Sequence, residues 1–252
     1  MIIAVANQKG GVGKTTTTVN LAAYIAKLGR SVLLVDLDPQ ANATSALGVN
    51  KDKIELSLYD VLVEAEPVES VIVSTKYRGL HLLPSSPVLA AAEIELTKLP
   101  HREMRLKMAL SSLQYDIILI DCPPSLGLLT INGLTAAHRL LIPVQAEYFA
   151  LEGLGQLLTT MQRVKQALNP ALALLGVVLT MYSPRTSLSS AVAQEVERHF
   201  PDMICSTVIP RNIRLAEAPS HGKAIAEYDR FSKGARAYKA LAKEVLQRVD
   251  KA

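Results

Sequence analysis

Glycines, lysines and threonines crowd together near the start of the chain, where residues 8–18 read QKGGVGKTTTT. Glycines lack side chains, so their backbone N–H groups can approach a ligand, and the Gly13-Lys14-Thr15 end adds a cation and a hydroxyl. These groups suit the phosphates of a nucleotide. A flexible turn would also contain glycines, but the position between an apolar run and a helical stretch favours a phosphate loop.

This loop departs from the common phosphate-loop pattern, G-x-x-x-x-G-K-[ST]. Gln8 stands where that pattern has its first glycine. A second lysine, Lys9, precedes the glycine pair and is the feature that sets this loop apart.

Carboxylates follow two apolar runs and could complete a metal site. Mg²⁺ on a bound nucleotide needs hydroxyl and carboxylate ligands. Thr15 offers the hydroxyl, and Asp121 ends the run IILID as a Walker B candidate. The run VLLVD ends in Asp36, which could hold metal-bound water, and Asp38 beyond it could orient the attacking water and take up its proton. Alternatively, these residues only mark strand ends and an Asp-Pro turn.

Short aliphatic runs alternate with helical stretches along the chain. Most runs are apolar throughout, which predicts buried parallel strands at residues 2–6, 31–36, 80–84, 115–121, 139–144, 172–180 and 205–210. Helical spacing predicts helices at 15–28, 151–168 and 187–200. The repeated βαβ pattern predicts an α/β fold of the P-loop NTPase type, a mostly parallel central sheet with helices on both faces. Ligands of such sheets collect at the carboxyl ends of the strands.

Composition bounds the class of protein. The 252 residues, 49% of them hydrophobic, can form a single domain spanning 1–252, with an acidic surface excursion at 48–70. A net charge of +4 does not by itself require an acidic partner. Cys122 and Cys205 form no CxxC pair, so a reducing cytosol fits better than a disulfide framework or zinc site. We expect neither a signal peptide nor a membrane span.

Three motifs together resemble the deviant Walker A ATPases, and among them the chromosomal ParA/Soj partitioning ATPases: KGGVGKTT (9–16), DLDPQ (36–40) and IDCPPS (120–125). The stretches PVQAEYFALEGL, LTMYSPRT and VIPRNIRLAEAPSHGKAI extend the resemblance over nearly the whole chain. The resemblance implies a Mg²⁺-dependent ATPase with slow intrinsic turnover that forms a sandwich homodimer with ATP. It also implies non-specific binding of double-stranded DNA on the nucleoid and stimulation by a ParB/Spo0J-type centromere-binding protein.

The same resemblance implies roles for single residues. Lys14 contacts the β- and γ-phosphates, Lys9 reaches the nucleotide of the opposite protomer, and Asp38 is the hydrolytic aspartate. The implied nucleotide-binding residues are Lys9, Gly10, Gly11, Val12, Gly13, Lys14, Thr15, Thr16, Met181, Pro210, Arg211 and Asn212. The last four of these lie around the adenine, and Gly10 lies where a side chain would obstruct dimer closure.

Two arginines, Arg185 and Arg214, match DNA-contacting residues of the family. From the residues alone, a solvated surface charge is the more common role for such arginines. Lys223 and Arg230 are near enough in sequence to extend a basic surface.

A MinD-like cell-division ATPase is the first alternative, because it shares the phosphate loop but binds membrane through an added C-terminal amphipathic helix. The tail 234–252 places apolar residues near one helix face, namely Ala235, Tyr238, Leu241, Ala242, Val245 and Val249. Since no second amphipathic segment follows, we expect this stripe to pack on the sheet, with no membrane partner. The first strand starts at residue 2, so the N-terminal helix-turn-helix domain of plasmid-type ParA proteins is not expected.

Two further alternatives come from other classes. A relative of the nitrogenase iron protein would need two cysteines placed to hold a cluster between subunits, and neither Cys122 nor Cys205 occupies such a loop. A non-catalytic nucleotide-binding module would not need Asp38 and Asp121 together with the lysine and threonine of the loop.

Overall fold

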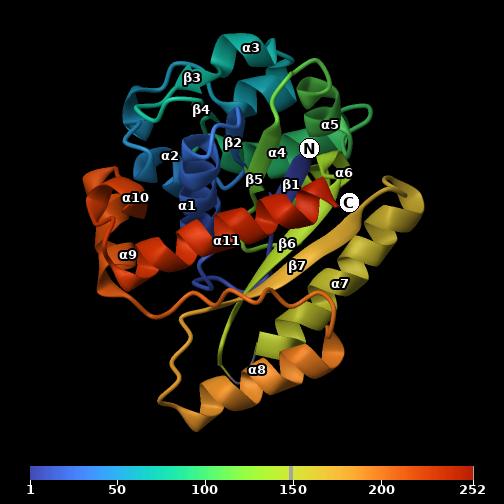
Figure 1. Cartoon of the computed structure of the whole chain (residues 1–252). Coiled ribbons are helices and arrows are strands. Elements are labelled where there is room, and N and C mark those ends of the chain that lie inside the picture. The colour runs from blue at the N-terminus through green and yellow to red at the C-terminus, as the bar shows by residue number, and fades with distance from the viewer. Residues whose placement is uncertain (148–149, 252) are drawn as a thin grey trace.

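One seven-stranded sheet organises the computed structural model, which describes residues 1–147 and 150–251. The strands lie in the order β3-β4-β2-β5-β1-β6-β7 (Figure 1). Their bounds are β1 (Ile2–Val5), β2 (Val32–Asp36), β3 (Val73–Ser74), β4 (Leu80–Leu83), β5 (Ile117–Asp121), β6 (Arg139–Gln145) and β7 (Ala173–Thr180). Only β3 runs antiparallel to its neighbour within the described sheet, so the carboxyl ends of the other strands share one edge.

Helices cover both faces of this sheet, as the βαβ pattern predicts. One apolar core lies under α1 (Lys14–Lys27), α2 (Asn42–Ala46), α9 (Ile213–Glu217), α10 (Ile225–Tyr228) and α11 (Lys233–Asp250). The other lies under α3 (Val68–Val71), α4 (Leu89–Glu95), α5 (Arg105–Leu110), α6 (Leu128–Ala136), α7 (Ala150–Ala167) and α8 (Ser187–His199). Short turns η1 (Lys51–Lys53), η2 (Asp60–Glu64), η3 (Leu96–Lys98) and η4 (Ala218–His221) complete the chain. The predicted fold class is therefore confirmed.

The sequence patterns locate most elements closely. The six predicted strands up to residue 180 and the three predicted helices all form, with ends that shift by no more than two residues. The predicted packing of the tail is also confirmed, because Tyr238 and Leu241 of α11 are fully buried in the core beside α1 (Figure 1). Among the described residues, no helix is both long and apolar enough to span a membrane.

The predicted strand at 205–210 is wrong. This segment runs beside β7 and donates to it, for example from the N–H of Ile209 to the carbonyl of Leu179 at 2.8 Å, but it forms only isolated bridges and no continuous ladder among the described residues. The carboxylate of Glu244 on α11 accepts the N–H groups of Ser206 and Thr207 at 2.9 and 3.0 Å. The Glu244 carboxylate thus binds two backbone N–H groups that are free to pair with a neighbouring strand in a regular sheet. The described sheet instead gains β3 at its edge.

The expected surface excursion at 48–70 is also partly wrong. Leu58, Val61, Leu62 and Val68 are all buried and belong to the core under α4 and α5. Their spacing along η2 and into α3 places them on one side of the segment. The charged residues between them had obscured this pattern.

Candidate nucleotide site

The loop between β1 and α1 has the backbone of a phosphate cradle. Gly11 and Gly13 have φ angles of 74° and 86°, in the left-handed region that strongly favours glycine. Gly10 lacks this constraint within the protomer, since an added Cβ would meet only the Pro124 side chain at 4.0 Å. The hydroxyl of Thr180, the last residue of β7, donates to the carbonyl of Val12 at 2.8 Å and ties the loop to the sheet.

The two loop lysines face different surroundings. Lys14 is 7% exposed, and its ammonium donates to the carbonyl of Lys9 at 3.0 Å. Burial lowers the pKa of Lys14, while the nearby Asp121 opposes that shift. The side chain of Lys9 is 36% exposed and extends to Glu147, with 3.4 Å between the ammonium and Oε2. One lysine therefore points into the cradle and the other lies at its rim.

Asp36 and Asp121 end adjacent strands and are direct neighbours in the register of β2 and β5. Both are fully buried. Burial, and then the neighbouring Asp36 carboxylate, raise the pKa of Asp121 to about 8. Thr18 donates to Oδ1 of Asp121 at 3.0 Å, but the buried Oδ2 has no hydrogen-bond partner in the described part of the chain. A buried carboxylate oxygen left free beside the phosphate loop fits a Mg²⁺ ion or its bound water.

The carboxylates of Asp36 and Asp38 accept hydrogen bonds from neighbouring groups of the chain. Oδ2 of Asp36 accepts both the backbone N–H and the hydroxyl of Thr44 at 2.7 Å. Burial raises the pKa of Asp36 to about 6, and these bonds act against that shift. Asp38 lies two residues beyond the strand, with its Oδ1 accepting the N–H of Gln40 at 2.9 Å. Asp38 is thus buried in a local turn at the same mouth, as the sequence predicts.

The residues assigned to the adenine do come together. A cavity of about 190 Å³ next to the phosphate loop is lined by, among others, Thr16, Met181, Pro210, Arg211 and Asn212. Two segments meet there, because the backbone of Tyr182 pairs with that of Pro210. The buried Oδ1 of Asn212 has no hydrogen-bond partner among the described residues, so it can accept from an amino group of a bound base.

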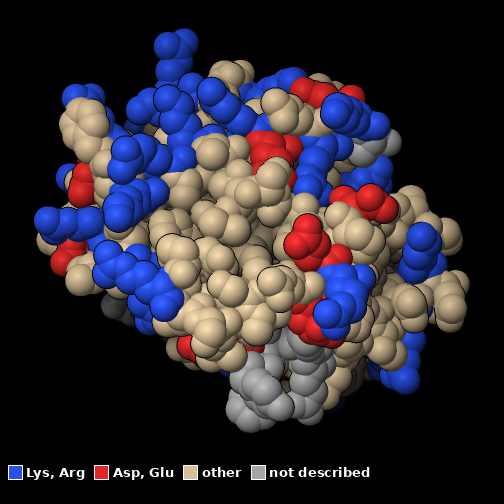
Figure 2. Space-filling view, turned by 60° about the horizontal axis from the view of Figure 1, so that its bottom comes forward, with Lys and Arg blue, Asp and Glu red and all other residues tan. Residues whose placement is uncertain are grey.

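The two predicted DNA-contacting arginines follow these paired segments but differ in their contacts. Arg214 on α9 pairs with Glu217 at 2.9 Å and lies 3.6 Å from Asp229. Arg185 is exposed in the loop before α8 and makes no ion pair within the described ranges. Figure 2 turns the lower end of the molecule in Figure 1 toward the viewer. On the face seen there, Lys and Arg side chains gather at the upper and left margins.

Sequence reasoning missed several residues that hold the site together. Thr18 and Thr44 hold the buried carboxylates, Thr180 holds the phosphate loop, and Glu147 meets Lys9. Thr18 carried a usable signal, because it lies three residues after Thr15 on one helix. The others come from distant segments, so only the folded chain reveals their roles.

The positions of the two cysteines argue against an iron–sulfur cluster held between subunits. Cys122 and Cys205 are 1% and 3% exposed and belong to the two separate cores on opposite faces of the sheet. Both thiols are thus buried inside the protomer, away from the surface where a cluster shared between subunits would lie.

Comparison with known proteins decides the family. The family model described as AAA domain matches residues 1–174. The sporulation initiation inhibitor protein Soj of Bacillus subtilis is 56% identical over 246 residues, covering 97% of each chain. The chromosome-partitioning ATPase Soj of Thermus thermophilus is 52% identical over 99% of this chain and 97% of its own. The chain belongs to the ParA/Soj family of chromosome-partitioning ATPases.

Solved structures agree with the fold. A Mycobacterium smegmatis protein named cobyrinic acid a,c-diamide synthase, with bound ATP analogue and magnesium, is 41% identical, with a TM-score of 0.87 over 99% of this chain and 95% of its own. The septum site-determining protein MinD of Pyrococcus horikoshii, complexed with Mg-ADP, is 30% identical, with a TM-score of 0.77 over 97% and 95%. The Soj proteins are more similar in sequence than MinD, which favours a partitioning role over the MinD-like alternative.

Proposed function

We propose that this chain is an ATP-driven switch for chromosome partitioning, which hydrolyses ATP slowly, dimerises around it and binds DNA without sequence preference on the nucleoid. The observation that carries this proposal is the divergence of the two loop lysines. Lys14 is buried in its own cradle, whereas Lys9 lies at the rim and can reach a second protomer. Only ATP brings a γ-phosphate to that rim, so ATP and not ADP drives dimerisation.

The carboxylates and hydroxyls at the carboxyl ends of the strands have separate roles in hydrolysis. Bound Mg²⁺ would supply positive charge to the β- and γ-phosphates of ATP. Two solved relatives hold magnesium together with an ATP analogue or ADP. Thr15 and the free Oδ2 of Asp121 would hold the ion, and Asp36 would hold its bound water. Asp38 orients the attacking water and accepts its proton. A ParB-type partner accelerates this slow step.

DNA binding follows from dimerisation. A chain with a net charge of +4 binds phosphates weakly on its own. A dimer places two copies of Arg185 and Arg214 on one assembly, and phosphate contacts add affinity without base preference. Lys223 and Arg230 stay as candidates for the edge of this surface. Hydrolysis separates the protomers and releases the DNA.

Two lysine variants test the proposed division of labour. Lys14→Ala should lose tight ATP binding, because it removes the charge inside the cradle. Lys9→Ala should bind ATP with nearly unchanged affinity yet stay monomeric in sedimentation velocity runs at saturating ATP, in an Asp38→Ala background that prevents turnover. Wild-type dimerisation by Lys9→Ala would overturn the cross-protomer role. Sedimentation with anionic liposomes in the presence of ATP distinguishes the MinD-like alternative.

A further inference from the structure

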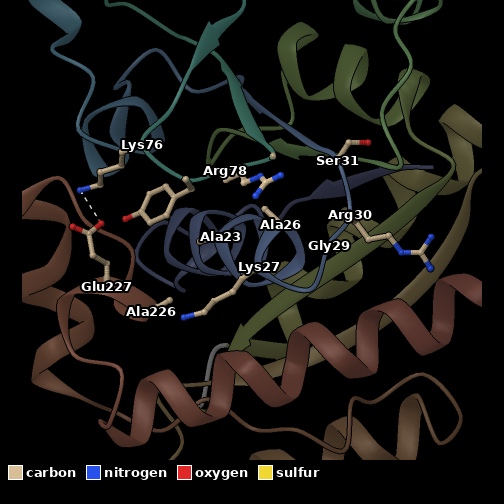
Figure 3. Close-up of a pocket in the computed structure, with 12 residues that line it drawn as sticks. Ala23, Ala26, Lys27, Gly29, Arg30, Ser31, Lys76, Arg78, Ala226 and Glu227 are labelled. Atoms are coloured by element: carbon tan, nitrogen blue, oxygen red, sulfur yellow. Dashed lines mark ion pairs between the residues drawn. The ribbon is translucent and has the colours of Figure 1, made fainter.

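A large groove lies at the opposite end of the molecule from the phosphate loop. It has a volume of about 830 Å³ and is lined by the carboxyl end of α1 and by residues just before β2 and β4, among them Lys27, Ser31 and Arg78. Figure 3 shows the Arg78 side chain extending above Ala26 on α1. Nothing in the proposed ATPase cycle uses this groove.

A second groove of about 560 Å³ continues the first. The two share Lys27 and Ala226, and the second extends between α1 and the start of α11. Two of its lining residues are apolar and exposed, with Leu28 at 41% and Phe231 at 75%. We call the two cavities together the polar-end groove.

The polar-end groove is strongly basic. Its cationic side chains include Lys27, Lys76, Arg78, Arg236 and Lys239, together with Arg230, which is also a candidate for the edge of the DNA-binding surface. Among its described lining residues the only acidic one is Glu227, and Lys76 and Lys223 pair with its two oxygens at 3.0 and 3.3 Å. Lys27 and Arg78 make no ion pair or side-chain hydrogen bond within the described chain. Positive charge therefore remains without compensation along the groove.

The charge of one further lining arginine, Arg30, is compensated by an ion pair. Its side chain turns away from Arg78 in Figure 3 and lies 3.4 Å from Asp250 of α11. The uncompensated charge is thus concentrated between α1, the segment before β4 and the start of α11.

The apolar residues of the groove indicate what kind of anion fits. The guanidinium of Arg230 lies 4.6 Å from the ring centre of Phe231, so cation and aromatic ring form one exposed unit. An exposed Phe and an exposed Leu that line the same groove suit an apolar side chain of a ligand. A phosphate group offers no such side chain, whereas an amphipathic peptide does.

The end of α1 that enters the groove disfavours a compact anion placed against it. Phosphate sites are typically built from backbone N–H groups at helix amino ends. Here α1 presents its carboxyl end, around Lys27 and Leu28, where carbonyl groups carry partial negative charge. An extended anionic chain can meet the surrounding cations without approaching those carbonyls, and the exposed Leu28 and Phe231 favour a chain that also carries apolar side chains. We propose that the polar-end groove binds an acidic, amphipathic peptide segment of a partner protein.

This site is separate from the nucleotide mouth. The groove adjoins the amino ends of β2 and β4, whereas the phosphate loop and Asp121 lie at the carboxyl ends of the strands. Peptide binding should therefore be the same with ATP, with ADP and without nucleotide. It should also survive the Lys14→Ala change, so failure of the proposed ATPase cycle would leave this proposal testable.

Fluorescence anisotropy with a labelled peptide, Glu-Glu-Leu-Glu-Glu-Phe-Glu-Glu, tests the proposal. Arg78→Glu should weaken binding by about tenfold through charge reversal, and Phe231→Ser by about fivefold through loss of the apolar contact. Lys243→Glu is the matched control, because it makes the same charge change on an exposed α11 position outside the groove lining. It should weaken binding by less than about twofold. Circular dichroism melts check that all variants fold.

Three outcomes would overturn the proposal. The first is no binding of the peptide by the wild-type protein. The second is an equal loss for Lys243→Glu and Arg78→Glu, which would indicate only long-range attraction. The third is indifference to Phe231→Ser together with displacement by inorganic tripolyphosphate or duplex DNA at equal charge concentration, which would indicate a phosphate site instead.

Discussion

The ammonium of Lys9 lies 3.4 Å from Oε2 of Glu147, at the rim of the phosphate loop. Gln145 donates to the other carboxylate oxygen at 2.6 Å, and Arg211 lies 3.8 Å from it. The lysine proposed to reach a second protomer is thus held by its own chain in the single protomer. Because both partners are substantially exposed, this pair contributes at most about 1 kcal/mol.

Glu147→Gln should therefore ease dimerisation. Releasing Lys9 removes a contact that dimer formation must break, so the ATP-dependent dimer should tighten by up to about fivefold. Sedimentation velocity in the Asp38→Ala background measures this. Glu195→Gln is the control, since it removes an exposed ion pair with Arg198 on α8. A weaker dimer for Glu147→Gln would show that this carboxylate assists assembly instead.

The central parts of the fold and site were predictable because their signals are local in sequence. Apolar runs ending in Asp36 and Asp121 define β2 and β5, and parallel pairing then brings both carboxylates to one edge. The phosphate loop is likewise one continuous motif, whose glycines at 11 and 13 have the backbone that the motif requires.

What sequence could not predict depends on contacts between distant segments. The apolar run at 205–210 resembles a strand, but Glu244 takes two of its N–H groups. Thr180 lies 168 positions from the loop carbonyl that it holds. No periodicity encodes such partners, and the same is true of the carboxylate that meets Lys9.

Thr180→Val should weaken ATP binding without unfolding the protein. The change keeps the shape of the side chain but removes its hydrogen bond to the Val12 carbonyl, so the loop loses one restraint. A loss of about 1 kcal/mol corresponds to roughly a fivefold rise in Kd for ATP. Isothermal titration calorimetry measures the change. Thr186→Val, at an exposed turn, is the control, and equal affinities for wild type and Thr180→Val would contradict a role for this tie.

Metal-free protein should lose stability as the pH rises. The raised pKa values of Asp36 and Asp121 mean that the folded chain keeps protons that the unfolded chain releases near pH 4. As far as these two groups decide it, the free energy of unfolding in EDTA should therefore be greatest below about pH 4 and should fall between about pH 4 and pH 8.

Asp121→Asn should flatten this pH profile, because it removes the more strongly shifted carboxyl group. Asp202→Asn, at an exposed turn, should leave the profile as it is. Urea titrations at several pH values provide the measurement. A metal-free wild type that becomes more stable between pH 5 and pH 8, by a margin that depends on Asp121, would reverse the expected sign.

The salt dependence of DNA binding by ATP-loaded Asp38→Ala protein tests the central claim most directly. With Arg185 and Arg214 each meeting one phosphate in both protomers, log K should fall against log salt with a slope of roughly −3.6, on unrelated duplexes alike. Arg214→Glu should reduce the steepness by about two units, while Arg198→Glu on α8 should change it far less. Binding with ADP should be weak. Equal binding in ATP and ADP, or a slope unaffected by Arg214→Glu, would contradict a DNA-binding surface assembled by ATP.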